Sequence, residues 1–453
     1  MRGYRRSKTE KYVGKPLRRA IAIRIALYCF LVVLTTVIGI TQGLEGEPLN
    51  VLAKTADAIG LLAFAILALQ FIVASRLPWI ERPFGLDRLI RFHRSMGITV
   101  AALLVAHPSL MALSGEPELL TKLSVPWPVQ LGRVAVLVLF ATVVVSLRRA
   151  SLRIPYERWR FWHNFVAIAV LFLAFTHSFF VKGGIHTLPG RMFWIVLVGI
   201  AFAGWGYRSL QQWHQHHGGR YTVSQVIHEA NNTWSLVLIA ENGHGIQPHL
   251  PGQFAFIKAL DGYGAGEEHP FTIASCPEQD ELVFTIRNAG DFTKQIHKLN
   301  PGTRVLIHGP FGRFSADLYP EERELVFIAG GVGITPFLSM IRSMDRTAGW
   351  RSVTVLHACR TEADMLMCEE LTSIAKSAKG RLRLIHVLSS PEKSWQGLCG
   401  HIHGQLIQQQ FGALSEGRGF YICGPPRMME AIEKDLKQIG ISRQRIHSEK
   451  FAL

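Results

Sequence analysis

Four histidines lie inside apolar stretches of the sequence and form two pairs, His93 with His107 and His163 with His177. The members of each pair are fourteen residues apart. In an α-helix this spacing is just under four turns and about 21 Å, so both side chains face nearly the same way. Two such helices side by side would bring the imidazoles together in pairs at two depths. A haem iron with two histidine ligands is six-coordinate and passes single electrons, so the spacing predicts two b-type haems.

Each histidine taken singly has a structural alternative. A histidine in a membrane helix is often a hydrogen-bond partner for a neighbouring helix. A proton or metal pathway through the membrane would also use histidines. The repeated spacing favours haem ligands, because ionisable groups inside a membrane are costly and are retained for function.

Membrane helices are needed to position these histidines, and the sequence supplies six candidates. Hydrophobic residues make up 48% of the 453 residues, and long apolar stretches occur only before about residue 210. Each stretch is long enough to cross a bilayer. The six are 21–43, 53–75, 95–114, 129–147, 161–181 and 191–209. We predict an all-α six-helix transmembrane haem bundle at 21–210, after a basic arm at 1–20.

The location of the charge indicates how the helices are oriented. The formal net charge is +16, and basic residues are concentrated in the arm and in the loops at 76–91 and 148–160. Cytoplasmic loops carry this excess, so both termini are expected in the cytoplasm of a bacterial inner membrane. His93 and His163 then lie near the inner face. Because the charge follows membrane sidedness, the expected partner is the lipid bilayer and not nucleic acid. Arg133, on the outer side, is a candidate contact for a haem propionate.

After a linker at 211–219 the pattern changes to short alternating strands. Runs such as YTVSQVI, WSLVLIA and ELVFTIRN predict a small antiparallel β-barrel at 220–318. From residue 319 to 453, apolar strands such as ELVFIA and SVTVLHA alternate with helical stretches. This second pattern predicts an α/β doubly wound nucleotide-binding domain.

A glycine-rich segment follows the strand VFIA and precedes a helical run. It reads GGVGITP, from Gly330 to Pro336. Glycines allow a pyrophosphate to approach the backbone, and a helix N-terminus favours its negative charge. We expect Thr335 to cap this helix and Pro336 to occupy its first turn.

Three further segments stand at the joints of the soluble half. They are HPFTIAS at 269–275, YICGPP at 421–426 and the C-terminal EKFAL. In this order the segments resemble the ferredoxin–NADP reductase family. Where that family usually has an arginine, this chain has His269, which is typical of the branch of transmembrane NADPH oxidases and ferric reductases.

The resemblance implies FAD and nicotinamide sites. Phe271 would lie along the isoalloxazine and Thr272 near its N5. The same FAD segment contains His269, Pro270 and Ser275, and a second one contains Arg287 and Thr293 near the pyrophosphate. The nicotinamide nucleotide would be bound by Gly331, Gly333, Thr335 and Pro336 and bordered by Cys423, Gly424 and Pro425. Phe451 resembles the aromatic residue that covers the flavin, although two residues follow it here. The catalytic candidates are therefore Thr272, Cys423 and Phe451.

Arg360, in HACRTEAD, is placed where the resembled family contacts the adenosine ribose. An arginine there can pair with a 2′-phosphate, which favours NADPH and leaves NADH open.

A flavin is needed in this scheme because nicotinamide releases two electrons and haem iron accepts one. The chain is therefore expected to oxidise NAD(P)H inside and reduce an acceptor outside. The leading acceptor is dioxygen, giving superoxide, and the second is a ferric chelate. An electron relay to a partner protein is an alternative of another class. The sequence contains no calcium-binding loop pattern, so regulation by calcium is not expected. A regulatory subunit is left open.

Overall fold

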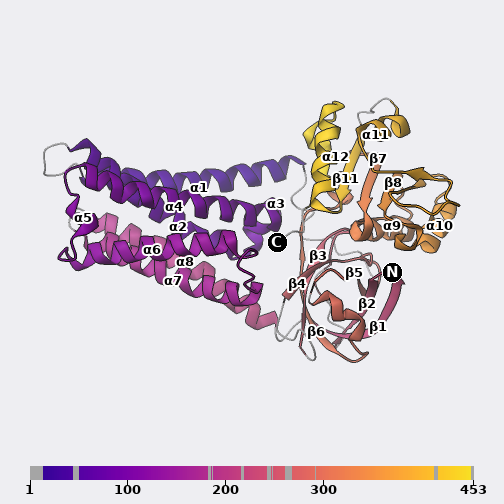
Figure 1. The fold of residues 1–453 in the computed structure, drawn as a ribbon, viewed down its shortest axis with the longest axis horizontal. Coiled ribbons are helices and arrows are strands. Elements are labelled where there is room, and N and C mark those ends of the chain that lie inside the picture. The colour runs from indigo at the N-terminus through magenta and orange to yellow at the C-terminus, as the bar shows by residue number, and fades with distance from the viewer. Residues whose placement is uncertain are drawn as a thin grey trace. The chain divides into compact units, whose positions relative to one another are not determined.

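The computed structural model describes residues 14–43, 50–181, 185, 187–215, 219–241, 246, 248–260, 268–290, 292–412 and 417–449. These residues divide into a helical unit at 18–211 and a second unit built around two sheets (Figure 1).

The helical unit contains six helices that are long and apolar enough to cross a membrane, as the sequence predicted. They are α1 (Gly14–Gly43), α2 (Val51–Ala74), α4 (Leu86–Leu113), α6 (Trp127–Arg148), α7 (Tyr156–Phe180) and α8 (Leu188–Gln215). Two short helices, α3 (Pro78–Phe84) and α5 (Glu118–Thr121), lie in the connections. The long helices run side by side in Figure 1. The chain is an integral membrane protein.

Helix α4 begins nine residues before the predicted stretch at 95–114. The additional turns are polar, and an ion pair between Arg91 and Asp87 (2.7 Å) spans one of them. Such i, i+4 pairs stabilise helices without adding apolar character, so hydropathy alone placed the beginning of the helix too late in the sequence. His93 therefore lies inside the helix.

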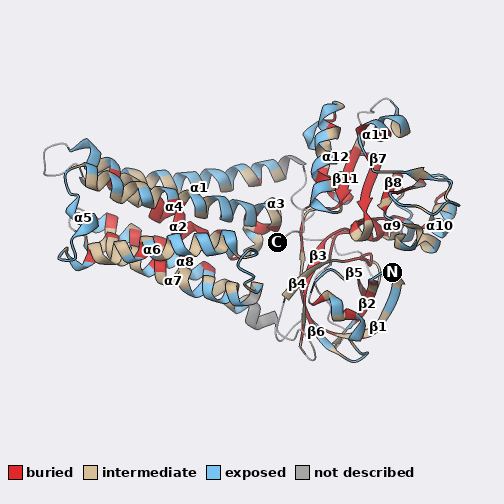
Figure 2. Cartoon of the chain, viewed as in Figure 1, coloured by how far each residue is buried: buried red, intermediate tan, exposed pale blue. Residues whose placement is uncertain are grey.

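The outer surface of the helical unit is apolar. Leu137, Phe165 and Phe172 are 61% to 70% exposed, and Figure 2 shows buried residues mostly where helices face one another. In water such a surface would be costly, but in a bilayer it contacts lipid. The centre of α2 is buried, and its Phe64 stacks on Trp194 of α8 with ring centroids 5.0 Å apart.

The first sheet of the second unit has six strands in the order β4-β3-β6-β1-β2-β5. Its strands are β1 (Arg220–Ala230), β2 (Thr233–Ala240), β3 (Phe254–Ala259), β4 (Glu268–Thr272), β5 (Leu282–Arg287) and β6 (Arg304–Phe311). All its strand pairs are antiparallel. Just after β4, the backbone N–H of Ala274 donates to Val283 of β5 (2.7 Å), which joins the two edges in a barrel-like way.

The second sheet is parallel throughout, with the order β10-β9-β8-β7-β11-β12. Its strands are β7 (Glu324–Gly330), β8 (Ser352–Cys359), β9 (Leu382–Leu388), β10 (Leu398–Cys399), β11 (Arg418–Cys423) and β12 (Ile446–Ser448). Its helices are α9 (Thr335–Thr347), α10 (Cys368–Ser377), α11 (Gly404–Phe411) and α12 (Pro426–Gln438). The strand order reverses between β7 and β11, and ligands of doubly wound sheets bind at such a switch point.

Helix α9 connects the two sheets. Its Ser339 hydroxyl donates to the carbonyl of Ser275 (2.7 Å), and its Arg342 donates to the carbonyl of Ala274 (2.8 Å). Arg342 also makes two bonds to Glu370 of α10, at 2.7 and 2.6 Å. A bidentate arginine–carboxylate pair holds the guanidinium in one orientation, so the segment after β4 is fixed against the nucleotide-binding sheet.

Candidate functional site

The structure brings His107 of α4 and His177 of α7 together, with ring centroids 6.4 Å apart and ring planes at 72°. The Nδ1 atom of His107 bonds to the carbonyl of Ala56 (2.7 Å), and that of His177 bonds to the carbonyl of Pro128 (2.8 Å). A carbonyl can only accept, so both Nδ1 atoms carry the hydrogen. Each Nε2 is then left with a free lone pair, as in a metal-ligating histidine whose other nitrogen is held by a backbone carbonyl.

Two glycines make this contact with the backbone possible. A methyl group added at Gly60 would lie 2.9 Å from Nδ1 of His107, and one added at Gly132 would lie 2.7 Å from Nδ1 of His177. Each glycine stands four residues after the carbonyl that its histidine contacts. Sequence reasoning did not single out these glycines, although a glycine within an apolar helix is a recognisable signal of close packing.

Gly132→Ala is expected to weaken haem binding at the His107–His177 pair about 10-fold, because the methyl group displaces His177 from its carbonyl partner. Haem content and the reduced-haem spectrum of the purified protein would measure the loss. Gly199→Ala is the matched control on α8, since nothing lies within 4 Å of its added carbon. Equal haem content in the two variants would show that Gly132 does not position His177.

The second pair, His93 and His163, has ring centroids 6.2 Å apart and ring planes at 80°. Trp159 stacks on His163 at 5.0 Å, and its indole N–H donates to the hydroxyl of Ser146 (3.1 Å). The Nδ1 atoms of both histidines are buried and have no hydrogen-bond partner among the described residues.

Both pairs have the spacing that a shared metal requires. Two axial imidazoles whose nitrogens lie about 2.0 Å from one metal have ring centroids roughly 6.3 Å apart. The layer between the pairs is aliphatic, with Val100 and Leu104 of α4 and Val170 and Ala174 of α7. The residues therefore fit two bis-histidine haems, one above the other.

Arg133 was considered as a contact for a haem propionate, but the structure gives it other partners. Its guanidinium donates to the carbonyls of Glu118 (3.2 Å), Leu119 and Lys122 (2.8 Å). The side chain thus holds α5 and the following turn, which form the connection between α4 and α6.

In the second unit, the backbones of the loops after β7 and β11 approach each other closely at the switch point. The Cα atom of Gly330 lies 3.1 Å from where a methyl group at Gly424 would be. A methyl group at Gly333 would lie 2.4 Å from the carbonyl oxygen of Cys423. Burial, with a contribution from the Glu449 carboxylate, raises the pKa of the Cys423 thiol, which therefore stays protonated near neutral pH.

The glycine-rich segment forms a 3₁₀ turn at Gly331–Ile334, and α9 follows directly. Gly331 has φ of +54°, which favours glycine. Pro336 lies in the first turn, as expected, but Thr335 does not cap the helix: the N-cap is Ile334. The Thr335 hydroxyl instead donates back to the carbonyl of Val332 (2.9 Å), because it already belongs to the first turn.

His357 of β8 supports this turn and was not identified from the sequence. Its Nε2 donates to the carbonyl of Gly331 (3.0 Å), which requires the ring to be protonated at that nitrogen. Burial lowers the pKa of His357 to about 4, so the ring is neutral at physiological pH. A neutral donor beneath the turn leaves its backbone free to face an anionic ligand.

The predicted FAD segment lies on β4. His269 stacks on Phe292, with ring centroids 4.1 Å apart and planes at 18°, and Phe271 lies 6.2 Å from the same ring. Pro270 and Thr272 pair with Phe256 and Phe254 of β3 and are partly exposed. Ser275, in contrast, is completely buried, and its hydroxyl accepts the N–H of Val283 (3.0 Å).

The second predicted FAD segment contains Arg287 and Thr293. Arg287 lies close to the glycine-rich turn, and Thr293 orders the loop after β5. Nη1 of Arg287 lies 3.6 Å from where a methyl group at Gly331 would be, so this cation reaches the glycine-rich turn. The Thr293 hydroxyl accepts the N–H groups of Ala289 (2.9 Å) and Gly290 (2.8 Å). This hydroxyl gives the loop after β5 a defined shape.

Three family models match the chain, each over one of these regions. Residues 59–174 match the ferric reductase like transmembrane component, 236–315 an FAD-binding domain, and 327–434 the oxidoreductase NAD-binding domain. The chain has the ferric reductase and NADPH oxidase type of architecture. The transmembrane match includes His93, His107 and His163 and ends three residues before His177.

Relatives of this oxidoreductase share only part of its length. It is 32% identical over 235 residues to the anthranilate 1,2-dioxygenase electron transfer component of Acinetobacter baylyi, covering 51% of this chain and 66% of that protein. It is also 32% identical over 167 residues to an NADH-cytochrome b5 reductase-like protein of Emericella nidulans, covering 37% of this chain and 35% of that one. The chain thus spans about one to two thirds of the length of these relatives. A flavohemoglobin structure from Malassezia yamatoensis matches with a TM-score of 0.50 and 16% identity, over 88% of this chain and 97% of that one.

The remaining predicted site residues of this ferric reductase-like chain are Arg360 and Phe451. Arg360 follows β8 and is exposed, and its carbonyl accepts the N–H of Ser390 (2.8 Å). Phe451 lies outside the described residues. The neighbouring β12 is held in place by a bond from His447 to Glu322 (2.7 Å).

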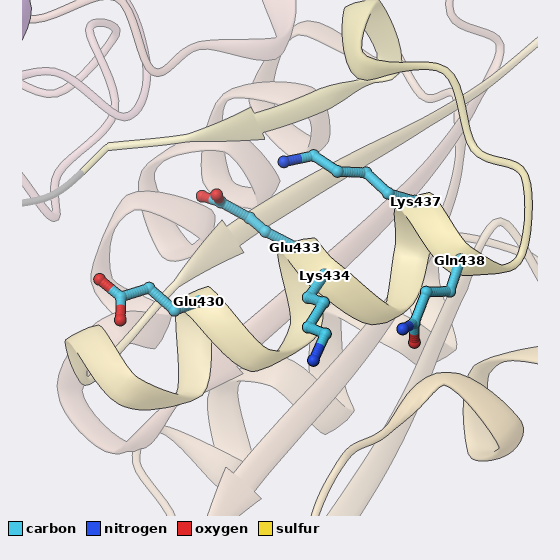
Figure 3. A pocket seen from close by; sticks show the side chains of 5 residues that line it. All are labelled: Glu430, Glu433, Lys434, Lys437 and Gln438. Carbon is cyan, nitrogen blue, oxygen red and sulfur yellow. The ribbon is translucent and has the colours of Figure 1, made fainter.

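A shallow depression on α12 does not belong to the cofactor sites. Figure 3 shows it lined by Glu430, Glu433, Lys434, Lys437 and Gln438. Acidic and basic residues four apart on one helix face support the helix itself. None of the residues predicted to bind a cofactor lies in this lining.

Proposed function

We propose that the chain is a transmembrane flavocytochrome b that oxidises NAD(P)H in the cytoplasm and delivers single electrons to an acceptor outside. The observation that carries the proposal is the pair of bis-histidine sites, 6.2 and 6.4 Å between ring centroids, in one chain with FAD- and NAD-binding domains. A flavin supplies the conversion of two-electron to one-electron transfer that such a chain needs.

The protein's part in the first step is to bind and orient the nicotinamide nucleotide. The turn from Gly331 to Ile334, held by His357, would present backbone N–H groups and the N-terminus of α9 to the pyrophosphate. Arg287 adds a positive charge beside Gly331. We propose that Cys423, Gly424 and Pro425 border the nicotinamide, with Phe271 and Thr272 on the flavin side and Phe451 as its cover.

We propose dioxygen as the acceptor, reduced to superoxide at the outer haem. The connection between α4 and α6, residues 114–126, is held against α6 by Arg133, whose guanidinium is bonded to carbonyls in and after α5. A small neutral acceptor needs no elaborate binding site, which favours dioxygen over a ferric chelate.

The deciding experiment uses the full-length protein in lipid nanodiscs with FAD and NADPH, under air. We expect cytochrome c reduction that superoxide dismutase abolishes. Reduction that the dismutase does not affect, together with ferric-chelate reduction, would instead support a ferric reductase. Reduced haem with neither product would support a relay to a partner protein, and protein without haem would contradict the proposal.

Arg360→Ala is expected to lower kcat/KM for NADPH about 10-fold and to leave that for NADH nearly unchanged. We propose that the exposed guanidinium after β8 pairs with the 2′-phosphate that only NADPH carries. Steady-state oxidation of both nucleotides measures the ratio, and Arg383→Ala, on the exposed face of β9, is the control. If the ratio of kcat/KM for NADPH to that for NADH is unchanged, Arg360 does not contact the 2′-phosphate.

A further inference from the structure

The outer histidine pair defines how α2 lies against α4. The first turns of α2 contact the last turns of α4, since Ala56 and Gly60 both meet His107. The two helices therefore pack antiparallel along their lengths. In an antiparallel pair, a step toward the C-terminus of α2 is matched by an equal step toward the N-terminus of α4.

The same step leads from one histidine to the other. His93 lies fourteen residues before His107, and Gln70 lies fourteen residues after Ala56. Fourteen residues bring a helix back to nearly the same face. Gln70 is therefore expected to lie opposite His93, just as Ala56 lies opposite His107.

Gln70 is unusual in its surroundings. It is 5% exposed, and neither its amide nitrogen nor its amide oxygen has a hydrogen-bond partner among the described residues. From residue 58 to 74 it is the single polar side chain in the sequence. A buried amide without a hydrogen-bond partner is costly, so a partner is expected in the working protein. The Nδ1 atom of His93 is likewise buried and without a partner in the part of the chain that is described.

Helices α6 and α7 repeat the relation. Pro128 and Gly132 meet His177, and fourteen residues further along α6 are Thr142 and Ser146, opposite His163. They are the two polar residues between 134 and 147. Ser146 already holds the Trp159 that stacks on His163. The Thr142 hydroxyl donates to Val138 (2.7 Å), which leaves its oxygen able to accept.

The outer histidines, His107 and His177, contact backbone carbonyls through Nδ1, whereas the inner ones, His93 and His163, have no such partner among the described residues. We infer a steric reason for this difference. At the outer level a glycine stands four residues after each accepting carbonyl, so the imidazole can reach the backbone. At the inner level the corresponding residues are Ala74 and Ser146. Both carry a Cβ atom, and at the outer level a Cβ atom in the equivalent place would lie within 2.9 Å of the imidazole. A side-chain acceptor is then required in place of a carbonyl.

We propose that Gln70 is a positioning residue for the inner haem, its amide oxygen accepting the Nδ1 hydrogen of His93, and that Thr142 serves His163 in the same way. The proposal rests on the haem assignment of the proposed function. Backbone carbonyls orient the outer ligands, His107 and His177, and side-chain oxygens orient the inner ligands, His93 and His163. An acceptor at Nδ1 makes the imidazole a stronger donor to the iron and thereby lowers the reduction potential of that haem.

The test is an anaerobic redox titration of the full-length protein in nanodiscs, following the haem absorption band. A variant without the outer haem, His107→Ala, assigns which midpoint potential belongs to the inner one. Gln70→Leu is expected to raise the inner midpoint and leave the outer one unchanged. Gln70→Glu retains an acceptor and is expected to keep the inner midpoint at or below that of the wild type. Leu67→Met, one turn away on the same face, is the packing control.

Equal inner midpoints in wild type and Gln70→Leu, or shifts in the same direction for the leucine and glutamate variants, would overturn the proposal. If Gln70→Leu does not retain the inner haem, Thr142→Val against Thr142→Ser decides, with a raised inner midpoint expected only for valine. Wild-type protein without two resolvable haems would instead contradict the proposed function, so the two failures are distinguishable.

Discussion

His177→Ala is expected to remove one of the two haems and to abolish reduction of any acceptor outside the membrane. The imidazole of His177 faces that of His107 at 6.4 Å between ring centroids, so its loss would leave a haem iron at this site with one protein ligand. The pyridine haemochrome assay measures haem per chain, and dismutase-sensitive cytochrome c reduction measures electron delivery. Flavin reduction by NADPH is expected to continue at the wild-type rate, because it occurs in the other unit.

His401→Ala is the control, since this histidine is exposed in the second unit. Unchanged haem content in His177→Ala would contradict the ligand assignment. Unchanged haem content in both His177→Ala and His163→Ala would mean that the histidines only pack helices together. The proposed electron pathway through two haems would then be wrong.

Gly333→Val is expected to reduce NADPH-driven flavin reduction at least about 100-fold. Its Cβ atom would lie 2.4 Å from the carbonyl oxygen of Cys423, and backbone atoms cannot rotate away as a side chain can. The loops after β7 and β11 must then separate, and a displacement of about 1 Å at a reacting geometry can cost 100-fold in rate. Stopped-flow absorbance of the flavin measures the effect directly.

Gly417→Ala is the matched control for this variant. A methyl group there meets its nearest neighbour, the Cβ atom of Arg323, at an ordinary 3.9 Å. Haem content should be the same in both variants, since the change lies in the other unit. Normal flavin reduction in Gly333→Val would mean that the two loops do not need to meet for hydride transfer.

The sequence predicted the fold class because its periodicities are strong. The six apolar stretches, the antiparallel strands and the alternating strands and helices were all confirmed. The boundaries were less accurate where a helix continues through polar residues, as α4 does at Arg91. The histidines could be chosen from their spacing, but not the partners of their Nδ1 atoms. For His107 and His177 those partners are backbone carbonyls, which carry no sequence signal of their own.

Other parts of the site depend on contacts between distant segments. His357 supports Gly331 from a neighbouring strand, and Arg342 fixes the segment after β4 from a helix sixty-eight residues away. Thr335 had the right residue type for a cap but the wrong position by one residue. The sequence suggested a haem propionate as the partner of Arg133. Its actual partners, the carbonyls of α5, could not be foreseen because this short helix was not predicted.

The aliphatic layer between the two histidine pairs has an electrical consequence. Arg94 directly follows His93, but residues 95–106, up to His107, and residues 164–176, between His163 and His177, include no ionisable side chain. In the proposed reaction, an electron moves outward through this layer with no proton to accompany it, so each turnover would transfer net charge. With the cell interior negative, a membrane voltage of 100 mV favours that transfer by about 2.3 kcal/mol per electron. Sustained turnover would therefore depolarise the membrane unless a cation leaves by another route, and a proton ionophore should accelerate the reaction in sealed vesicles.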